Sequence, residues 1–180
     1  PLAYRIIKIT SALYRLWGGV RVKQLEDIWV AKWKDPSMFS GVSGVGAEDC
    51  AYLTAVELEL KRAKGENITL GSIDVFKCFD QINRCMLQEI AKCAGMPQRI
   101  LKPYFAYINN LLVRYQIGDS IGPPHHERCS IPQGCPFSML FVALLLRPWI
   151  IQAKKDGTIP RVLADDLLLL LSLIHISEPT

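Results

Sequence analysis

The segment Arg161–Leu170, RVLADDLLLL, constrains the fold most strongly, because two adjacent carboxylates interrupt an otherwise apolar run. An apolar run of this length is typical of a buried strand or a hairpin arm. Neighbouring carboxylates in such a run repel each other and lose hydration, which is unfavourable unless a positive charge compensates. Asp165 and Asp166 therefore lie either in an exposed turn between two hydrophobic arms or at a divalent-metal site on a hairpin tip.

The composition is that of a folded protein with one domain or two small lobes. Half of the 180 residues are hydrophobic, so a substantial core is expected and long disorder is not. Lysine and arginine number 21 against 17 acidic residues, and the net charge of +4 is compatible with a polyanionic partner without identifying one. Six cysteines without a C-x-x-C pair predict reduced thiols in an intracellular protein.

Leucine-rich runs and a mean hydropathy of +0.18 raise the alternative of a membrane-associated helical protein. The apolar run Met139–Leu146 is followed at once by Arg147 and Pro148. It is well short of the roughly 20 residues that are needed to span a bilayer. We therefore predict a buried core helix over residues 137–151 and no membrane association.

Both ends of the chain have unusual features. The chain starts at Pro1, and its last ten residues, Leu171–Thr180 (LSLIHISEPT), resemble the in-frame translation of a transposase adapter used in sequencing libraries. We expect residues 171–180 to be a non-native tail and the natural protein to extend beyond both ends of this segment.

Hydrophobic periodicity and turn residues predict alternating helices and strands before the final hairpin. The predicted elements are a short strand at 5–7, a helix around 13–20, a helix over 47–64, a strand over 68–80, a helix near 87–94, a helix from Gln98 that bends or stops near Pro103, and a hairpin at 113–117 that turns at Gly118 and Asp119.

Three features that are far apart in the sequence suggest one chemistry. They are Asp74, the P-Q-G-x-P run and the Asp165–Asp166 hairpin tip. Asp74 projects from one face of a predicted strand, since Ile73 and Val75 point to the other face. The P-Q-G-x-P run at 132–136 cannot form a regular helix or a central strand. Two neighbouring strands with carboxylates can hold two Mg²⁺ ions, as in-line phosphoryl displacement requires.

The order of these motifs resembles the fingers and palm of a reverse transcriptase of the type carried by non-LTR retrotransposons. SIDVFKCFD (72–80) is similar to the first catalytic motif of that family, and IPQGCPFSML (131–140) is similar to its substrate-loop motif. LADD (163–166) stands where the family usually has Y-A-D-D. RIIKITSALYRLW (5–17) resembles the arginine-led fingers motif, and FSGVSGVGAEDCAYL (39–53) resembles the glycine-rich segment before the palm.

This resemblance implies an α+β fold, the right-hand fingers and palm of a polymerase, with an antiparallel palm sheet backed by helices. It places Asp74 and Asp165 on adjacent strands. Residues 1–70 would form part of the fingers, and residues 71–170 would form the palm, with fingers elements near 82–134.

The resemblance also implies catalytic roles for Asp74, Asp165 and Asp166. Asp74 and Asp165 would ligate two Mg²⁺ ions, with Mn²⁺ as an alternative, and Asp166 would support them. The backbone carbonyl of Val75 would be a further metal ligand.

For the incoming nucleotide, Phe79 matches the steric-gate aromatic that excludes a ribose 2′-OH. Gln133 and Gly134, with Pro132, would line the nucleotide pocket, and Arg5 would hold the triphosphate. The implied partners are an RNA template, a DNA primer and dNTPs. The resemblance says nothing of the oligomeric state.

Two positions depart from the family pattern. Leu163 replaces the tyrosine of Y-A-D-D, and Ile6 follows Arg5 where proline is usual. These departures leave a second hypothesis open, a catalytically decayed retroelement remnant that at most binds nucleic acid.

Overall fold

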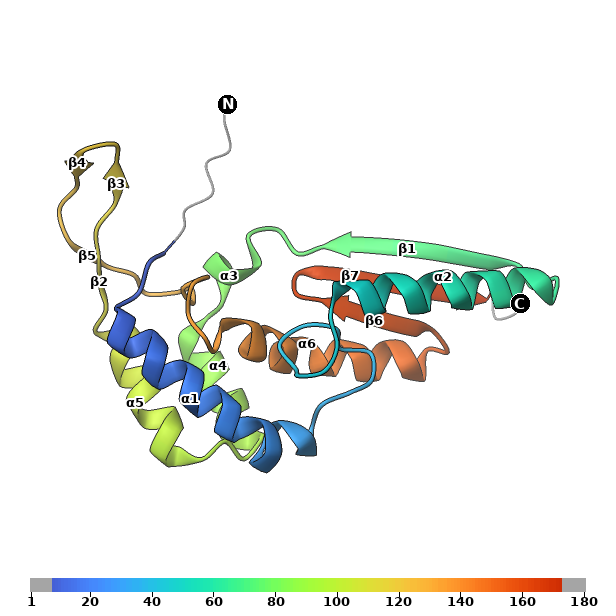
Figure 1. The fold of residues 1–180 in the computed structure, drawn as a ribbon, viewed down its shortest axis with the longest axis horizontal. Helices are drawn as coiled ribbons and strands as arrows, with labels where there is room; N and C mark the ends of the chain where they lie inside the picture. Colours follow the sequence, from blue (N-terminus) through green and yellow to red (C-terminus); the bar gives the residue numbers. More distant parts are fainter. Residues whose placement is uncertain (1–7, 173–180) are drawn as a thin grey trace, which may run out of the picture. The chain divides into compact units, whose positions relative to one another are not determined.

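The computed structural model describes residues 8–172, and Figure 1 shows their helices and strands. These residues divide into two compact units, unit 1 with residues 8–29 and 77–138, and unit 2 with residues 30–76 and 139–172. All paired strands of the three sheets are antiparallel, and helices accompany them in both units. The α+β prediction is confirmed.

Unit 2 is built on a three-stranded sheet of order β1-β7-β6, drawn in green and red in Figure 1. Its strands are β1 (Ile68–Asp74), β6 (Ile159–Leu163) and β7 (Asp166–Ser172). Val162 of β6 and Leu167 of β7 are cross-strand partners, and both are buried. Burial of such pairs determines the register, because a slip of one residue would turn every side chain to the opposite face.

The chain before α2 lengthens this sheet by one short pairing. Val162 donates its N–H to the Ser37 carbonyl and accepts a hydrogen bond from the Phe39 N–H, both at 2.8 Å. The side of β6 that does not pair with β7 is thereby partly covered. This pairing satisfies backbone groups that an edge strand would otherwise leave unpaired.

Helix α2 (Ala47–Ala63) confirms the helix predicted over 47–64. The carboxylate of Asp49 accepts a hydrogen bond from the Gly46 N–H at 2.8 Å, which satisfies a backbone group at the helix start. Further along α2, the Leu53 carbonyl accepts a hydrogen bond from Arg161 of β6 at 3.1 Å. Helix and sheet are therefore joined through a buried arginine.

Helix α6 (Ser138–Lys155) confirms the core helix predicted over 137–151, begins one residue later, and is buried throughout residues 140–144. It continues through Pro148 and ends eight residues after Arg147. No helix within residues 8–172 has the length and apolar character to cross a membrane.

Unit 1 is mainly helical. Its elements are α1 (Ala12–Ile28), α3 (Cys78–Gln81), α4 (Arg84–Cys93), α5 (Gln98–Asn109) and the strand pairs β2 (Leu112–Val113) with β5 (His125–His126) and β3 (Gln116–Ile117) with β4 (Ser120–Ile121). The Tyr14 ring of α1 stacks on Tyr107 of α5 with 3.7 Å between ring centroids. Trp29 donates its indole N–H to the Ala94 carbonyl at 2.7 Å, which joins the end of α1 to the end of α4.

Most predicted elements of unit 1 are confirmed. The helices near 13–20, 87–94 and from Gln98 are present, and the hairpin turns at Gly118 and Asp119 as predicted. The P-Q-G-x-P run has no helix or strand. The predicted strand at 5–7 lies outside the described residues.

The strand predicted over 68–80 is shorter in the structure, because β1 ends at Asp74. Lys77 has a φ of 47°, a left-handed conformation that cannot continue a strand, and α3 begins at the next residue. Apolar residues continue past Asp74, at Val75, Phe76, Cys78 and Phe79, so the composition of this segment does not show where the strand ends.

The sequence predicts a bend or a stop near Pro103, and the stop is wrong, since α5 runs through this residue to Asn109. Proline lacks the N–H that would bond the preceding turn, and an interior proline costs about 3 kcal/mol. On either side of Pro103, Leu101, Tyr104 and Phe105 are buried, so packing outweighs this cost.

Strand β7 extends to Ser172, so two residues of the predicted non-native tail take part in the sheet. Leu171 pairs with Thr69, and Ser172 pairs with Ile68. Residues 173–180 lie outside the described part of the chain.

Candidate active site

Two carboxylates face each other at one end of the unit 2 sheet. Asp74 is the last residue of β1, Asp166 is the first of β7, and the two are directly paired across the antiparallel ladder. Residues paired in this way have Cβ atoms about 5 Å apart. Both residues are exposed.

Asp165 occupies the turn beside this pair. A two-residue loop, Ala164 and Asp165, joins Leu163 of β6 to Asp166, and the Asp165 carbonyl accepts the Val75 N–H at 3.1 Å. The predicted placement of Asp165 on a strand next to Asp74 is therefore wrong. Asp165 lies in the tight turn, and the next residue, Asp166, occupies the strand position opposite Asp74. Asp74, Val75, Asp165 and Asp166 nonetheless lie together at one sheet end.

The chemistry of this sheet end fits a hard divalent cation. Like charges directly opposite on paired strands destabilise a sheet, and no ion pair within the described part of unit 2 compensates Asp74 or Asp166. Mg²⁺ prefers carboxylate oxygens and is usually held by one or two carboxylates, with substrate phosphates and water as its other ligands. No group of three or more His, Cys, Asp or Glu side chains in residues 8–172 is arranged to enclose a metal.

Strained backbone accompanies the three motifs at 72–80, 131–140 and 163–166. In residues 8–172, the non-glycine residues with positive φ are Lys77 (47°), Ser130 (78°) and Ala164 (57°). Each lies within three residues of a predicted site residue, namely Val75, Gln133 and Asp165. Strained conformations of this kind cluster at functional sites, where the surrounding structure must hold them. This observation supports all three motifs independently of their resemblance to a family.

The strain at Ala164 leads to a stability prediction. A positive φ at only the first position of a two-residue hairpin loop matches the turn type that favours glycine there. Ala164→Gly should therefore stabilise the chain by about 0.5 to 1 kcal/mol, as measured by urea unfolding. Ala164→Val should destabilise it, since a β-branched residue fits this conformation worse than alanine. Unchanged stability in both variants would contradict the assigned turn strain.

Phe79, Gln133 and Gly134 belong to unit 1. Phe79 lies in α3, and its carbonyl accepts a hydrogen bond from the Ile131 N–H at 3.0 Å. Gln133 and Gly134 are exposed in the turn that follows Pro132. A Cβ at Gly134 would lie 2.6 Å from the Lys8 carbonyl oxygen, so only glycine permits this approach of the N-terminal segment. Arg5, the predicted triphosphate ligand, lies outside the described residues.

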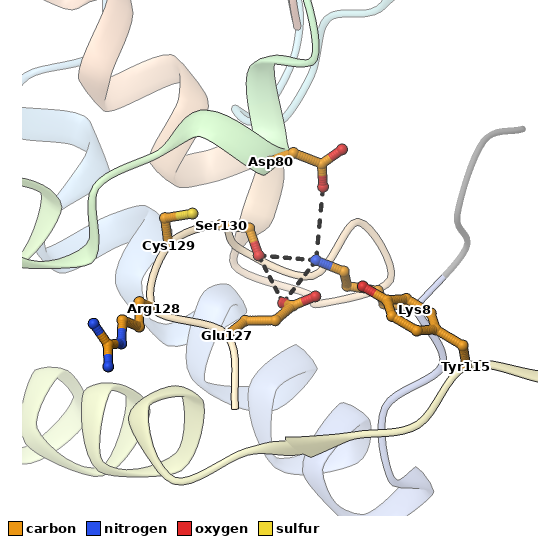
Figure 2. Close-up of a pocket in the computed structure, with 7 residues that line it drawn as sticks. All are labelled: Lys8, Asp80, Tyr115, Glu127, Arg128, Cys129 and Ser130. Carbon is orange, nitrogen blue, oxygen red and sulfur yellow. Dashed lines mark hydrogen bonds and ion pairs between the residues drawn. The ribbon is translucent and has the colours of Figure 1, made fainter. Parts of the chain in front are cut away.

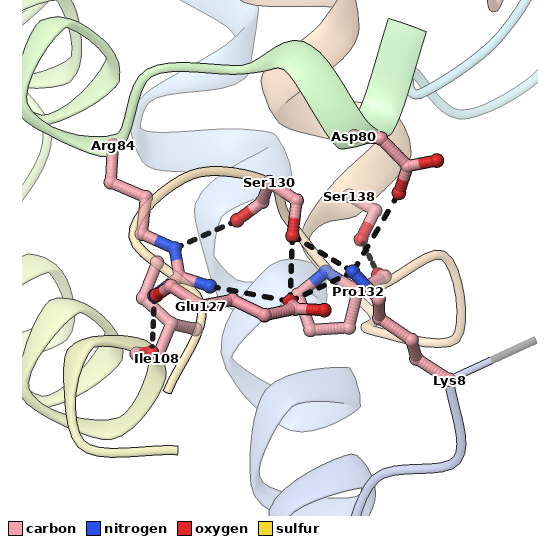
Figure 3. Close-up of polar contacts among 8 residues, drawn as sticks. All are labelled: Lys8, Asp80, Arg84, Ile108, Glu127, Ser130, Pro132 and Ser138. Carbon is pink, nitrogen blue, oxygen red and sulfur yellow. Dashed lines mark hydrogen bonds and ion pairs between the residues drawn. The ribbon is translucent and has the colours of Figure 1, made fainter. Parts of the chain in front are cut away.

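A polar cluster behind this loop was not identified by sequence reasoning. Arg84 is buried at the start of α4 and donates hydrogen bonds to the carbonyl oxygens of Ser130 (2.8 Å), Ile108 (2.8 Å) and Glu127 (2.7 Å), as Figure 3 shows. One signal could have revealed it. Arg84 lies on the same stripe as the buried residues Leu87 and Ala91, where an unpaired charge would be too costly.

Lys8 and Glu127 complete this cluster, which we call the Arg84 network (Lys8, Arg84, Glu127 and Ser130). The Lys8 ammonium lies 2.8 Å from both the Glu127 carboxylate and the Ser130 hydroxyl. Burial raises the pKa of Glu127, but hydrogen bonds from Lys8 and Ser130 and the charges of Lys8 and Arg84 outweigh this effect. The pKa of Glu127 is therefore held below its usual value.

The lowered pKa of Glu127 predicts an acid-dependent loss of stability. Its contribution is complete above the unfolded-state pKa of 4.5 and disappears as the pH falls through the lower folded-state pKa. Glu127→Gln should therefore be less stable than the unchanged chain at about pH 7, and the difference should shrink towards about pH 3. Urea unfolding across this pH range measures it.

The matched control is Glu89→Gln, which removes a more exposed carboxylate that pairs with Lys92 on the same helix. Exposed pairs contribute little, so this variant should follow the unchanged chain at every pH. A constant difference between Glu127→Gln and the unchanged chain would contradict the pKa assignment.

Three members of the Arg84 network, Lys8, Glu127 and Ser130, also line an open pocket of about 250 Å³ (Figure 2). The residues that line it are Lys8, Asp80, Tyr115, Glu127, Arg128, Cys129 and Ser130. The Lys8 ammonium points to Glu127, Ser130 and Asp80, whereas the Arg128 guanidinium points away from this cluster. The polar groups at its base therefore bond mainly to one another, and we assign no ligand to this pocket.

Comparison with known families identifies the chain. The family described as reverse transcriptase (RNA-dependent DNA polymerase) matches residues 1–175. The chain belongs to the reverse transcriptase family. A comparison with curated proteins found no match.

Two solved structures are similar to this reverse transcriptase chain. Apo telomerase from Candida tropicalis, truncated from its C-terminal domain, matches with a TM-score of 0.58 and 15% identity over 87% of this chain and 34% of that chain. Telomerase from Candida albicans, in complex with a fragment of telomeric RNA, matches with a TM-score of 0.49 and 14% identity over 88% of this chain and 30% of that one. The chain spans about a third of the length of these structures. The similarity to the first confirms the predicted polymerase fold of fingers and palm.

Proposed function

We propose that the chain is part of an RNA-directed DNA polymerase of the type carried by non-LTR retrotransposons. The observation that carries this proposal is the pairing of Asp74 with Asp166 beside the Asp165 turn, in a chain of the reverse transcriptase family. We assign residues 1–70 to the fingers and 71–170 to the palm, with fingers elements near 82–134 and a non-native tail at 171–180. We place the protein inside the cell.

The proposed reaction is nucleotidyl transfer from a dNTP to the 3′-OH of a primer paired with an RNA template. Asp74, Asp165 and the Val75 carbonyl would hold two Mg²⁺ ions, or Mn²⁺ in their place. When bound, such ions supply Lewis-acid activation of the hydroxyl and stabilise charge on the leaving oxygen. Asp166, which faces Asp74 across the strands, contributes to the negative charge that attracts these cations.

The residues of unit 1 would bind and select the nucleotide. Phe79 would exclude a ribose 2′-OH by its bulk, which gives preference for deoxynucleotides. Gln133 and Gly134 would contact the nucleotide from the exposed turn after Pro132. Arg5 would pair with the triphosphate, for which a guanidinium is well suited because it forms bidentate bonds to phosphate.

Primer extension tests this proposal. The complete open reading frame that encodes this chain should extend a DNA primer on an RNA template with dNTPs and Mg²⁺. Asp165→Asn should abolish the extension, since an amide is a weaker metal ligand than a carboxylate. An Asp165→Asn variant as active as the unchanged protein would show that the catalytic assignment is wrong.

Leu163 supports a second candidate function, that of a decayed remnant that at most binds nucleic acid. Leu163 ends β6 and pairs with Asp166, so it lies next to the proposed catalytic residues. If decay explains this leucine, the unchanged reading frame is inactive and Leu163→Tyr restores primer extension. Full activity of the unchanged reading frame would exclude the decayed remnant.

A further inference from the structure

Ser130 is strained, and all its polar groups are engaged. Its φ of 78° lies in the left-handed region, and the residue is 3% exposed. Its N–H donates to the Ile82 carbonyl at 2.9 Å, its carbonyl accepts from Arg84, and its hydroxyl donates to Glu127 at 2.9 Å. A strained residue persists only where its surroundings hold it, and such residues mark sites that need a defined geometry.

Arg84 is the centre of these contacts, as Figure 3 shows. Its Nε donates to the Ser130 carbonyl, and one terminal nitrogen donates to the carbonyls of both Ile108 and Glu127. The other terminal nitrogen lies 3.8 Å from the Glu127 carboxylate. The planar guanidinium can donate in several fixed directions at once, which the ammonium of a lysine cannot do.

The same contacts join two segments that the proposed function places around the nucleotide. Ser130 and Ile131 donate their N–H groups to the carbonyls of Ile82 and Phe79, at 2.9 Å and 3.0 Å. The substrate loop is therefore hydrogen-bonded to the segment that carries the proposed steric-gate aromatic. Arg84 lies two residues after Ile82, the last bonded residue of that segment, and donates a hydrogen bond to the Ser130 carbonyl of the loop.

We propose that Arg84 is a positioning residue for sugar selection, which holds Phe79 and the loop of Gln133 and Gly134 in one rigid arrangement. This inference rests on the proposed function and extends it. Arg84 is buried and would act through Ser130 and Glu127, to which it is hydrogen-bonded. Loss of Arg84 leaves the catalytic aspartates unchanged. It allows the distance between Phe79 and the loop of Gln133 and Gly134 to vary, so that ribonucleotides are rejected less well.

The experiment compares kcat/KM for a dNTP and for the matching rNTP in the complete reading frame. Arg84→Lys keeps the positive charge but loses the planar guanidinium that donates in several directions. We expect the ratio of dNTP to rNTP efficiency to fall about tenfold, since small misplacements near a substrate have large effects on rate. The control is Leu87→Ala on the same helix, which removes a buried side chain that makes none of these hydrogen bonds. This control lowers the folded fraction and leaves the ratio unchanged.

A second measurement does not depend on catalysis. Hydrogen exchange in the 180-residue chain should show faster exchange of the Ser130 and Ile131 amides, relative to the amides of α5, in Arg84→Lys but not in Leu87→Ala. An unchanged sugar ratio in a folded Arg84→Lys variant, or unchanged relative exchange, overturns the positioning role. Absence of primer extension by the unmodified protein contradicts the proposed function and, with it, the role of Arg84 in sugar selection. Hydrogen exchange then still decides whether Arg84 couples the two segments.

Discussion

Asp74→Asn and Asp166→Asn should each lower primer extension on RNA by at least about a hundredfold, because each removes negative charge from the proposed metal site. The measurement is the initial rate with Mg²⁺, an RNA template and dNTPs in the complete reading frame. Asp156→Asn is the matched control, since Asp156 is exposed beyond the end of α6 and accepts a hydrogen bond from Gln152 of that helix. Its rate should equal that of the unchanged protein.

Stability distinguishes loss of catalysis from loss of folding in these variants. Asp74 and Asp166 repel each other across the strands, so either asparagine variant should be more stable than the unchanged chain without divalent ions, by about 0.2 to 1 kcal/mol. Added Mg²⁺ should raise the Tm of the unchanged chain more than that of the variants, since a bound ligand stabilises the folded state. An inactive variant that is also destabilised would contradict a metal role for the pair.

Gly41→Ala should destabilise unit 2 by about 3 to 5 kcal/mol, the largest effect that we expect on folding. Gly41 has a φ of 70°, and a Cβ added there would collide with the backbone carbonyl of Met139 at the start of α6. Backbone atoms cannot move aside as a flexible side chain can, so the cost of the collision adds to the conformational strain. Urea unfolding of the 180-residue chain measures the loss.

Gly44→Ala is the matched control in the same glycine-rich segment. Gly44 also has a positive φ, 85°, but nothing lies within 4 Å of a Cβ added there. Its replacement should therefore cost only the conformational strain, about 1 to 2 kcal/mol. Equal losses in the two variants would show that the approach of Gly41 to α6 is not tight.

The sequence alone was sufficient for the elements whose signals are local. The charges at both ends of α2, the turn residues Gly118 and Asp119, and the final hairpin are patterns over a few residues, and the structure confirms all of them. The proposed site residues could be named for the same reason, because Asp74, the P-Q-G loop and the Asp165–Asp166 pair are short motifs in a characteristic order.

Other features depend on contacts between distant parts of the chain. The passage of α5 through Pro103 depends on packing, since neighbouring side chains are buried and Tyr104 contacts Phe137, which lies outside the helix. The role of Arg84 depends on carbonyl groups that lie 24 to 46 residues further along the chain.

The carboxylates at the hairpin tip show this division most clearly. The sequence by itself determined that Asp165 and Asp166 interrupt an apolar hairpin and that Asp74 lies in a strand. Only the tertiary structure decided that Asp166, rather than Asp165, faces Asp74. The physical reason is that side-chain alternation specifies which face of a strand a residue occupies, whereas the partner across the ladder depends on register, which long-range burial and the turn determine.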